Sequence, residues 1–351
     1  MSSARRFDQI FLHIGLGKTG SSSLQAYFRQ QAAVLERDHG ILYPDFSSVE
    51  PGFDGNHSRY LQLLFAPPDD LEQVFVLRRQ DSDADRLRYQ QRARAAWKSA
   101  LETASAQRLL LSAESLGHTR RESLEVLCEQ LQSLSDRVTV IACIRHPYSA
   151  LSSEIQQRVS AGAVLQNLFE QPPHYALRPL LQRFSELFGE DNIRLYDFEW
   201  ARRYPGGLEQ AFLDVVGIEL PGSPVPGAQN ASMSMKATLL LSSLNRQQPL
   251  IVGGRRNPLR SDDVQGRMAA IPGDKFAAPA AAYARLEEEI APHLCWLRRH
   301  FGFEPEMGDV QFAPESMLWQ SAALDREARW RAAYWRARGR LASLLKGRPG
   351  G

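Results

Sequence analysis

Short apolar runs alternate with longer amphipathic stretches along the first two thirds of the chain. An apolar run bounded by glycine, proline or polar residues predicts a strand, whereas apolar residues spaced three or four apart predict a helix. The predicted strands are residues 10–14, 40–44, 109–114, 138–144 and 193–198. The predicted helices are residues 24–35, 82–105, 121–134, 147–159, 208–216, 235–246, 280–301 and 322–345.

Nearly continuous apolar strands separated by helices predict a parallel sheet with helices on both faces. We therefore expect an α/β fold in three layers, α/β/α, with a central mainly parallel sheet and a helical C-terminal extension. The expected organisation is a core over residues 1–220, a helical part of the same domain over residues 221–320 and a tail helix over residues 321–351. Ligands bind such sheets beyond the carboxyl ends of the strands, so the loops after the first, third and fourth strands should form one site.

The charge composition excludes some broad classes of function. The chain has 351 residues, with 42 Lys and Arg against 40 Asp and Glu, so it lacks the positive field of a protein that binds duplex nucleic acid. Its three widely spaced cysteines argue against a disulfide framework and a Cys-based zinc site, and they favour a reducing compartment. No signal-peptide pattern or long apolar segment is present, so we expect a soluble, cytoplasmic protein.

Positive charge is concentrated in the tail, where residues 325–351 hold eight basic and two acidic side chains. The tail helix also carries an apolar stripe, which makes it amphipathic. The stripe consists of Trp330, Tyr334, Ala337, Leu341 and Leu344. We expect the stripe to pack on the parent domain or on a second subunit in a homodimer. The alternative is peripheral contact with anionic lipid at the inner membrane face.

A glycine-rich loop follows the first predicted strand and leads into a helix. Gly15, Gly17 and Gly20 allow the backbone to turn tightly and to point N–H groups inward, and the helix adds the positive end of its dipole. Lys18 lies in the middle of this loop, although only five of the 42 basic residues are lysines. The loop therefore predicts a phosphate site. Its predicted ligand-binding residues are Gly17, Lys18, Thr19, Gly20, Ser21, Ser22 and Ser23.

The loop departs from the Walker A pattern of nucleotide-hydrolysing proteins and kinases. Leu12 stands where that pattern requires its first glycine. No later strand ends in an aspartate that would hold magnesium, because Ser-Ala-Glu and Arg-His-Pro follow the third and fourth strands. A P-loop kinase or phosphotransferase with a degenerate Walker A loop is the alternative hypothesis that these residues leave open.

Residues 17–25, Gly-Lys-Thr-Gly-Ser-Ser-Ser-Leu-Gln, resemble the 5′-phosphosulfate-binding loop of the PAPS-dependent sulfotransferases, above all the bacterial and carbohydrate-type members. That family also has an arginine at the end of a central strand and a serine eight residues later, which together bind the 3′-phosphate. Arg145 and Ser153 match this pair. The resemblance implies a P-loop-type fold, PAPS (3′-phosphoadenosine 5′-phosphosulfate) as co-substrate and no metal. It also implies sulfuryl transfer to a hydroxyl or amine of a glycan, lipid or small metabolite.

The resemblance implies that Lys18 and the loop stabilise the departing 5′-phosphate, and the acceptor must lose a proton to a nearby base. His57, in a polar loop after the second strand, and Glu114, directly after the third, are the candidate bases. We favour Glu114 because strand ends are held rigidly. His13, inside the first strand, should pack or form a hydrogen bond in the core. A further alternative is a non-catalytic nucleotide-binding module tethered to a membrane complex by its tail.

Overall fold

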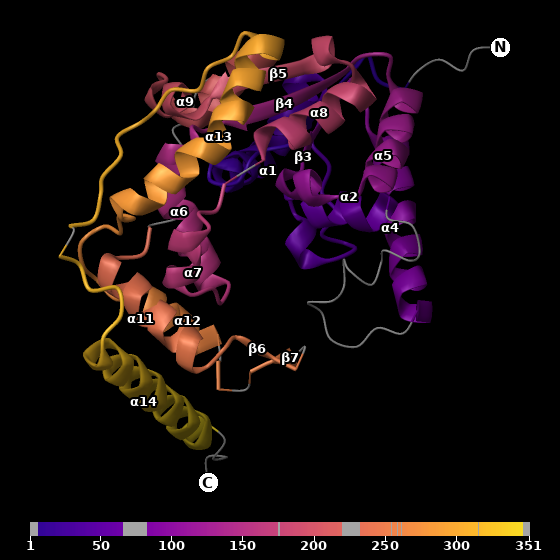
Figure 1. Cartoon of the computed structure of the whole chain (residues 1–351). Helices are drawn as coiled ribbons and strands as arrows, with labels where there is room; N and C mark the ends of the chain where they lie inside the picture. Colours follow the sequence, from indigo (N-terminus) through magenta and orange to yellow (C-terminus); the bar gives the residue numbers. More distant parts are fainter. Residues whose placement is uncertain are drawn as a thin grey trace. The chain divides into compact units, whose positions relative to one another are not determined.

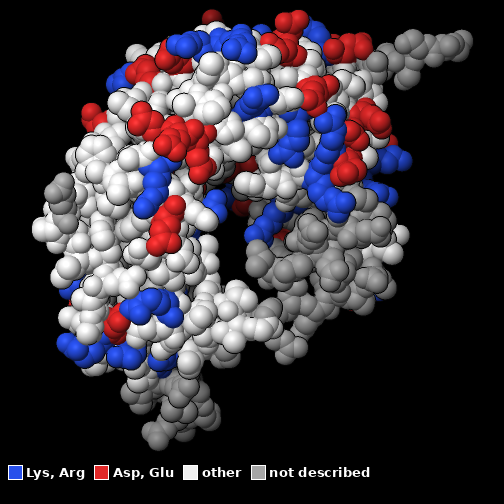
Figure 2. Space-filling view, viewed as in Figure 1, with Lys and Arg blue, Asp and Glu red and all other residues white. Residues whose placement is uncertain are grey.

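The structure, a computed structural model, describes residues 6–65, 83–174, 176–219, 232–253, 255–257, 259–260, 262–314 and 316–346 (Figure 1). The chain divides into two compact units. The first unit comprises Met1–Arg145, Tyr175–Gln229 and Trp296–Glu306, and the second comprises His146–His174, Asn230–Cys295 and Met307–Gly351. This division does not coincide with the expected boundaries near residues 220 and 320. Acidic and basic side chains are intermixed over much of the visible surface, in keeping with the balanced composition (Figure 2).

The first unit is built on a five-stranded sheet in which every pair of neighbouring strands is parallel. The strands are β1 (Gln9–His13), β2 (Ile41–Leu42), β3 (Arg108–Ser112), β4 (Val138–Ile144) and β5 (Ile193–Asp197). Their order across the sheet is β2-β3-β1-β4-β5, so β1 lies at the centre between β3 and β4. The expected α/β class with a parallel central sheet is confirmed.

Helices cover both faces of this sheet. Those of the first unit are α1 (Ser21–His39), α2 (Ser58–Phe65), α4 (Asp83–Thr103), α5 (Arg121–Leu134), α8 (Leu177–Phe188), α9 (Phe198–Arg203) and α10 (Gly207–Val216), with the 3₁₀ helices η1 (Pro51–Phe53), η3 (Glu114–His118) and η4 (Glu190–Asn192). Alternate strand residues such as Phe11 and Ile141 pack against α1 and α10 on one face. The intervening residues, such as Leu12 and Val140, are equally buried, and α8 contacts β4 and β5. This alternation of buried side chains produces the three layers.

The second unit is mainly helical. Its elements are α6 (Pro147–Ser160), α7 (Leu165–Glu170), α11 (Met235–Gln247), α12 (Asp262–Ala269), α14 (Ala322–Lys346), most of α13 (Ala280–Phe301) and the antiparallel pair β6 (Ile251–Val252) and β7 (Arg255–Arg256). Fully buried side chains of α6, α11 and α13, such as Ile155, Leu241 and Leu286, form its core. None of the described helices of either unit is long and apolar enough to cross a membrane.

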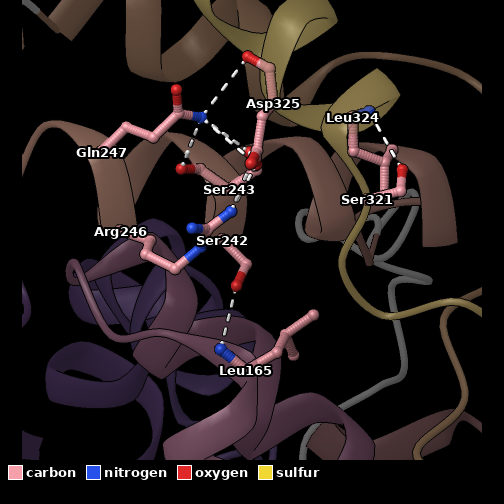
Figure 3. A network of polar contacts seen from close by, with 8 residues as sticks. All are labelled: Leu165, Ser242, Ser243, Arg246, Gln247, Ser321, Leu324 and Asp325. Carbon is pink, nitrogen blue, oxygen red and sulfur yellow. Dashed lines mark hydrogen bonds and ion pairs between the residues drawn. The ribbon is translucent and has the colours of Figure 1, made fainter.

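A polar network joins α14 to α11 within the second unit (Figure 3). The Asp325 carboxylate accepts hydrogen bonds from the Ser243 hydroxyl at 2.6 Å and from the Arg246 guanidinium at 2.5 Å. One residue earlier on α11, the Ser242 hydroxyl accepts a hydrogen bond from the Leu165 backbone N–H at 2.9 Å, which ties α7 to the same helix. These bonds fix the first turns of α14 and so decide which face of that helix is covered.

The covered face of α14 differs from the predicted stripe. Ala328 and Ala332 are fully buried against the core of the second unit. Trp330 and Tyr334 are exposed, so the expectation that they pack on the parent domain is wrong. The small alanine side chains allow close approach of the helix backbones, and the bulky aromatic side chains consequently point away from the unit. The last two members of the stripe, Leu341 and Leu344, lie outside the side chains that the structure describes.

Candidate functional site

The loop between β1 and α1 has the backbone geometry of an anion site. Lys18 has a φ of 64° and is the sole non-glycine residue with positive φ in the described part of the chain, and Gly20 follows with a φ of 79°. Left-handed residues beside right-handed ones turn successive N–H groups towards one side. No side chain caps α1, and although the Ser23 N–H donates to the Gly20 carbonyl at 2.9 Å, the N–H groups of Ser21 and Ser22 have no partner among the described residues. The loop can therefore surround a phosphate or a sulfate.

The Lys18 ammonium has no acidic partner in the part of the chain that the structure describes. Among the residues that the structure describes, no carboxylate forms an ion pair with Lys18. By contrast, Lys98 lies 3.7 Å from Glu102 and Lys236 lies 3.1 Å from Glu327. A half-buried cation in the middle of an anion-binding loop, without a carboxylate beside it, supplies the compact positive charge that a bound anion needs.

The hydroxyl groups of the loop differ in what they do. The buried Thr19 hydroxyl donates to the Leu16 carbonyl and therefore braces the loop itself. Ser21 is only 3% exposed, and its Oγ has no hydrogen-bond partner among the described residues. A Cβ atom on Gly15 would lie 2.3 Å from that Oγ, so a glycine is required there to leave room for it. Ser22 is exposed and Ser23 is half-buried. Ser21 is thus the serine most clearly left for a ligand.

Arg145 is held directly beside the loop. It follows the last residue of β4, and its Nη1 donates a hydrogen bond of 3.2 Å to the Lys18 carbonyl oxygen. Its guanidinium carbon lies 4.6 Å from the centre of the Phe198 ring, and its Nε lies 3.8 Å from the Glu199 carboxylate. The side chain retains 20% exposure. The structure therefore brings together two residues that the sequence predicted as phosphate ligands, Lys18 and Arg145.

Glu199 is a site residue that sequence reasoning did not single out. It lies in the first turn of α9, its side chain is only 4% exposed, and it also forms an ion pair of 3.0 Å with Arg202. A buried carboxylate between two arginines fixes their direction and balances part of their charge. The contact links β4 to the segment after β5, so no local sequence pattern could have indicated it.

Ser153, the expected partner of Arg145, lies on α6 in the second unit. Within the described residues its hydroxyl makes no hydrogen bond, and the residue is half-buried. Its neighbours are engaged, because the Ser149 hydroxyl accepts from the Gly308 N–H at 2.8 Å and the Ser152 hydroxyl accepts from the Ala278 N–H at 3.2 Å. The role of Ser153 in phosphate binding stays a prediction.

His57 is a structural residue in this conformation and not a base ready to accept a proton. It is fully buried, and its Nε2–H donates to the Pro44 carbonyl at 2.8 Å. Its Nδ1 accepts from the Ser112 backbone N–H at 3.0 Å, and its own N–H donates to the Ser112 carbonyl at 3.0 Å. Burial lowers the pKa of His57 to about 4. With both ring nitrogens bonded to backbone, His57 holds the polar loop against the end of β3.

His13 and Ser112 form a second buried contact below the loop, as expected for His13. They are directly paired across β1 and β3, and His13 Nδ1 lies 2.9 Å from the Ser112 Oγ, which also accepts a hydrogen bond of 3.2 Å from Gln25 on α1. His13 Nε2 is buried and has no hydrogen-bond partner in the described part of the chain. Burial lowers the pKa of His13 to about 4, so its ring is neutral at ordinary pH.

Glu114 lies where the strand pattern placed it. It begins η3, two residues beyond the end of β3, and is half-buried. The preceding residue, Ala113, donates its N–H to the His13 carbonyl at 2.8 Å, which extends the pairing of β3 with β1 past the strand ends. The backbone that carries Glu114 is thus fixed to the strand from which the anion loop starts.

In the described part of the chain, no group of three or more His, Cys, Asp and Glu side chains could hold a metal ion. The strands on either side of β1 end in Ser112 and Ile144, so neither strand ends in a carboxylate. The assembled site therefore consists of loop N–H groups, a free hydroxyl and two cations. Such a set can bind an anionic group and neutralise negative charge that develops on its oxygens.

Comparisons with known proteins give sulfotransferases as structural neighbours. A sulfotransferase from Alicyclobacillus acidocaldarius is 14% identical over 63% of this chain and 85% of that one, with a TM-score of 0.34. The sulfotransferase domain from the curacin biosynthetic pathway is 15% identical over 76% of this chain and 98% of that one, with a TM-score of 0.36. No family model and no curated protein sequence matches the chain. Because both TM-scores are low, the function proposed below depends on the residues of the site.

Burial of His13 and His57 predicts that the folded chain becomes less stable as the pH falls. Their pKa values are about 4 in the folded chain against an ordinary 6.5, so between these values the unfolded chain binds protons that the folded chain does not. The free energy of unfolding should therefore fall as pH falls from about 6.5 towards 4, by up to about 3 kcal/mol for each histidine. The free energy of unfolding measured by urea denaturation should change less with pH across this range for His13→Gln than for the wild type.

The matched control for this pH dependence is His118→Gln, since His118 is exposed in the folded chain. His118→Gln makes the same change at the surface and leaves both buried histidines in place, so the pH dependence of its unfolding free energy should stay close to that of the wild type. A pH dependence of His13→Gln equal to that of the control would contradict the buried, neutral state of His13.

Removing the Ser21 hydroxyl should not destabilise the ligand-free protein. A buried hydroxyl without a partner contributes nothing to folding, so Ser21→Ala should keep or raise the free energy of unfolding. Ser234→Ala is the contrast, because that hydroxyl caps α11 at 3.0 Å from the Ala237 nitrogen, and its loss should cost about 1 kcal/mol. Added inorganic sulfate should raise the melting temperature of the wild type more than that of Ser21→Ala. A destabilised Ser21→Ala protein would show that the hydroxyl is engaged within the fold.

Proposed function

We propose that this protein is a sulfotransferase that uses PAPS as donor and transfers the sulfuryl group to a hydroxyl or amine of a glycan, lipid or small metabolite. The observation that carries the proposal is the contact between the loop that contains Lys18 and Arg145, at the ends of the adjacent strands β1 and β4. Two phosphate-binding features, found independently in the sequence, support the same reading because they meet at one edge of the sheet.

Each residue of the loop has a definable task in this reaction. In sulfuryl transfer the bond between sulfur and the 5′-phosphate oxygen breaks as the acceptor oxygen or nitrogen bonds to sulfur, so negative charge grows on the leaving phosphate. Lys18 and the loop N–H groups neutralise that charge, and the Ser21 hydroxyl donates to the same group. Arg145 and Ser153 bind the 3′-phosphate, which distinguishes this donor from ATP. The chemistry then depends mainly on alignment of donor and acceptor.

The competing reading, a P-loop kinase, finds less support at the strand ends. Magnesium-dependent phosphoryl transfer needs a carboxylate beside the phosphate loop. Both strands next to β1 end without one. The expectation that no later strand ends in an aspartate is wrong, because β5 ends at Asp197. This carboxylate is already engaged, since it accepts hydrogen bonds from the Trp200 N–H at 2.7 Å and the Glu306 N–H at 2.9 Å.

Glu114 is the base that we propose for the acceptor proton. It is half-buried and sits on a backbone tied to β1, whereas His57 has both ring nitrogens bonded to backbone. A carboxylate there takes the proton as the acceptor attacks sulfur, so the products are the sulfated acceptor and adenosine 3′,5′-bisphosphate.

Titration calorimetry with adenosine 3′,5′-bisphosphate in the presence of EDTA tests donor recognition. The wild type should bind without metal, and Lys18→Ala should weaken binding of both this nucleotide and AMP by about 10- to 100-fold, because a charge-assisted bond to the 5′-phosphate is lost. Arg145→Ala should weaken the bisphosphate by a similar factor and leave AMP almost unchanged. Ser153→Ala should show the same selectivity with a smaller effect.

Lys98→Ala and Arg299→Ala are the matched controls, since both side chains are exposed and neither belongs to the site. Arg145→Lys keeps the positive charge but loses the forked donor geometry that suits a phosphate. Binding of ATP alone, and only with Mg²⁺, would overturn the proposal in favour of a kinase.

A sulfuryl-transfer assay with a library of hydroxyl and amine acceptors tests the assignment of the base. Glu114→Gln should lower kcat by about 10²- to 10⁴-fold while the affinity for adenosine 3′,5′-bisphosphate stays the same. His57→Gln should lower the melting temperature and, where the protein is folded, leave kcat near the wild-type value. An unchanged kcat for Glu114→Gln would remove Glu114 from the role, and an equal loss in folded His57→Gln would assign it to His57.

A further inference from the structure

The acidic residues of helix α14 make their contacts within the second unit. The Asp325 carboxylate is bound by Ser243 and Arg246 of α11, and its pKa is lowered by these hydrogen bonds. Glu327 forms ion pairs with Lys236 at 3.1 Å and with Arg331 at 2.8 Å. These two residues are the only acids in the sequence of α14. Negative charge on the helix is therefore already balanced inside the second unit.

The opposite face of α14 carries a row of side chains spaced four residues apart, Arg326, Trp330, Tyr334 and Arg338, which we call the outer row. Trp330 is 63% exposed and Tyr334 is 43% exposed. Their rings are stacked, with centres 5.4 Å apart and planes inclined by 8°, and the Arg338 guanidinium lies 5.8 Å from the centre of the Tyr334 ring. The aromatic pair is thus ordered by its own neighbours while it remains in water.

The outer row carries only positive charge. Arg326 and Arg338 are exposed, and so is Arg329 beside them, and none of the three forms an ion pair with any described carboxylate. Figure 2 shows more Lys and Arg than Asp and Glu over the region of α14. Two large aromatic side chains flanked by Arg326 and Arg338 are therefore presented to solvent on one helix face, whereas the charge of Arg329 beside them contributes to the lowered pKa of Asp325.

We propose that the outer row is a docking surface for an anionic lipid membrane. Trp and Tyr favour the interface between water and lipid, because each has an apolar ring and a polar tip. Arginines beside them match the negative charge of anionic headgroups, and a helix with this arrangement lies in the plane of the interface. The aromatic pair would insert between headgroups while Arg326, Arg329 and Arg338 contact the phosphates.

Charge decides between this partner and a second copy of the chain. Two outer rows brought face to face would oppose arginines to arginines, and no acid on α14 is left to pair with them. An anionic surface does not repel these arginines, because its negative charge attracts them. This inference is independent of the proposed function, because it concerns a helix that holds none of the loop residues or strand ends of the candidate site.

Cosedimentation of the full chain with vesicles tests the proposal without any nucleotide. Vesicles of phosphatidylcholine with phosphatidylglycerol should bind the wild type, and vesicles of phosphatidylcholine alone should bind it at least about tenfold more weakly. Trp330→Ala/Tyr334→Ala should lose the apolar part of the interaction, and Arg326→Glu/Arg338→Glu should lose the electrostatic part. Each pair should lower the partition coefficient by about tenfold or more, and added salt should weaken wild-type binding.

The matched controls place the same changes elsewhere. Leu318→Ala removes an apolar side chain that is 70% exposed, and Arg298→Glu/Arg299→Glu reverses two exposed charges on α13. Both should bind vesicles like the wild type, and circular dichroism should show every variant folded. Equal binding by the outer-row variants and the controls would overturn the proposal. So would a wild-type dimer in sedimentation that Trp330→Ala/Tyr334→Ala dissociates while vesicle binding is absent, because the partner would then be a second copy.

Discussion

The central position of β1 is the constraint on which the rest of the site depends. Its neighbours β3 and β4 both run parallel to it, so three strand ends reach the same edge of the sheet. The pairing continues beyond the strands, since Ala113 donates to the His13 carbonyl at 2.8 Å and Ile14 donates to the Ile141 carbonyl at 3.0 Å. The anion loop therefore starts from a backbone that is held on both sides. A shift of either neighbour would displace the loop and the residues that face it.

Buried hydrogen bonds next to this edge hold the strand ends and the neighbouring loop in place. His13 joins β1 to β3 through Ser112, and His57 joins the loop after β2 to the same strand end. Both imidazoles are neutral and serve as hydrogen-bonding spacers, because full burial makes the charged form costly. The proposed reaction therefore assigns proton transfer to a group closer to solvent, and neither buried imidazole adds positive charge next to Lys18 and Arg145.

The sequence predicted the parts of the structure that local pattern controls. The bounds of α5, β4 and α13 agree with the apolar periodicity because these elements are long or continuously buried. The short helices α2 and α7 were not predicted, since fewer than three turns give little periodic signal. The longer helix α8 was also missed, although its buried Leu180, Leu181, Phe184 and Phe188 follow helical spacing. The full burial of His57 was not predicted, because burial in three dimensions is not visible in a polar loop sequence. The contact of Arg145 with Glu199 joins separate strand ends, and the alanines of α14 gave no sign that they, rather than the aromatic residues, would be covered.

The left-handed backbone conformation of Lys18 has a consequence for which residues can replace it. A side chain with a Cβ atom pays on the order of 1–2 kcal/mol at such a backbone angle, and glycine would avoid this cost. Glycine would also remove the ammonium from the centre of the loop. Stability of the fold and the proposed anion binding therefore favour different residues at this position. The lysine found there favours a role in binding over a role in folding.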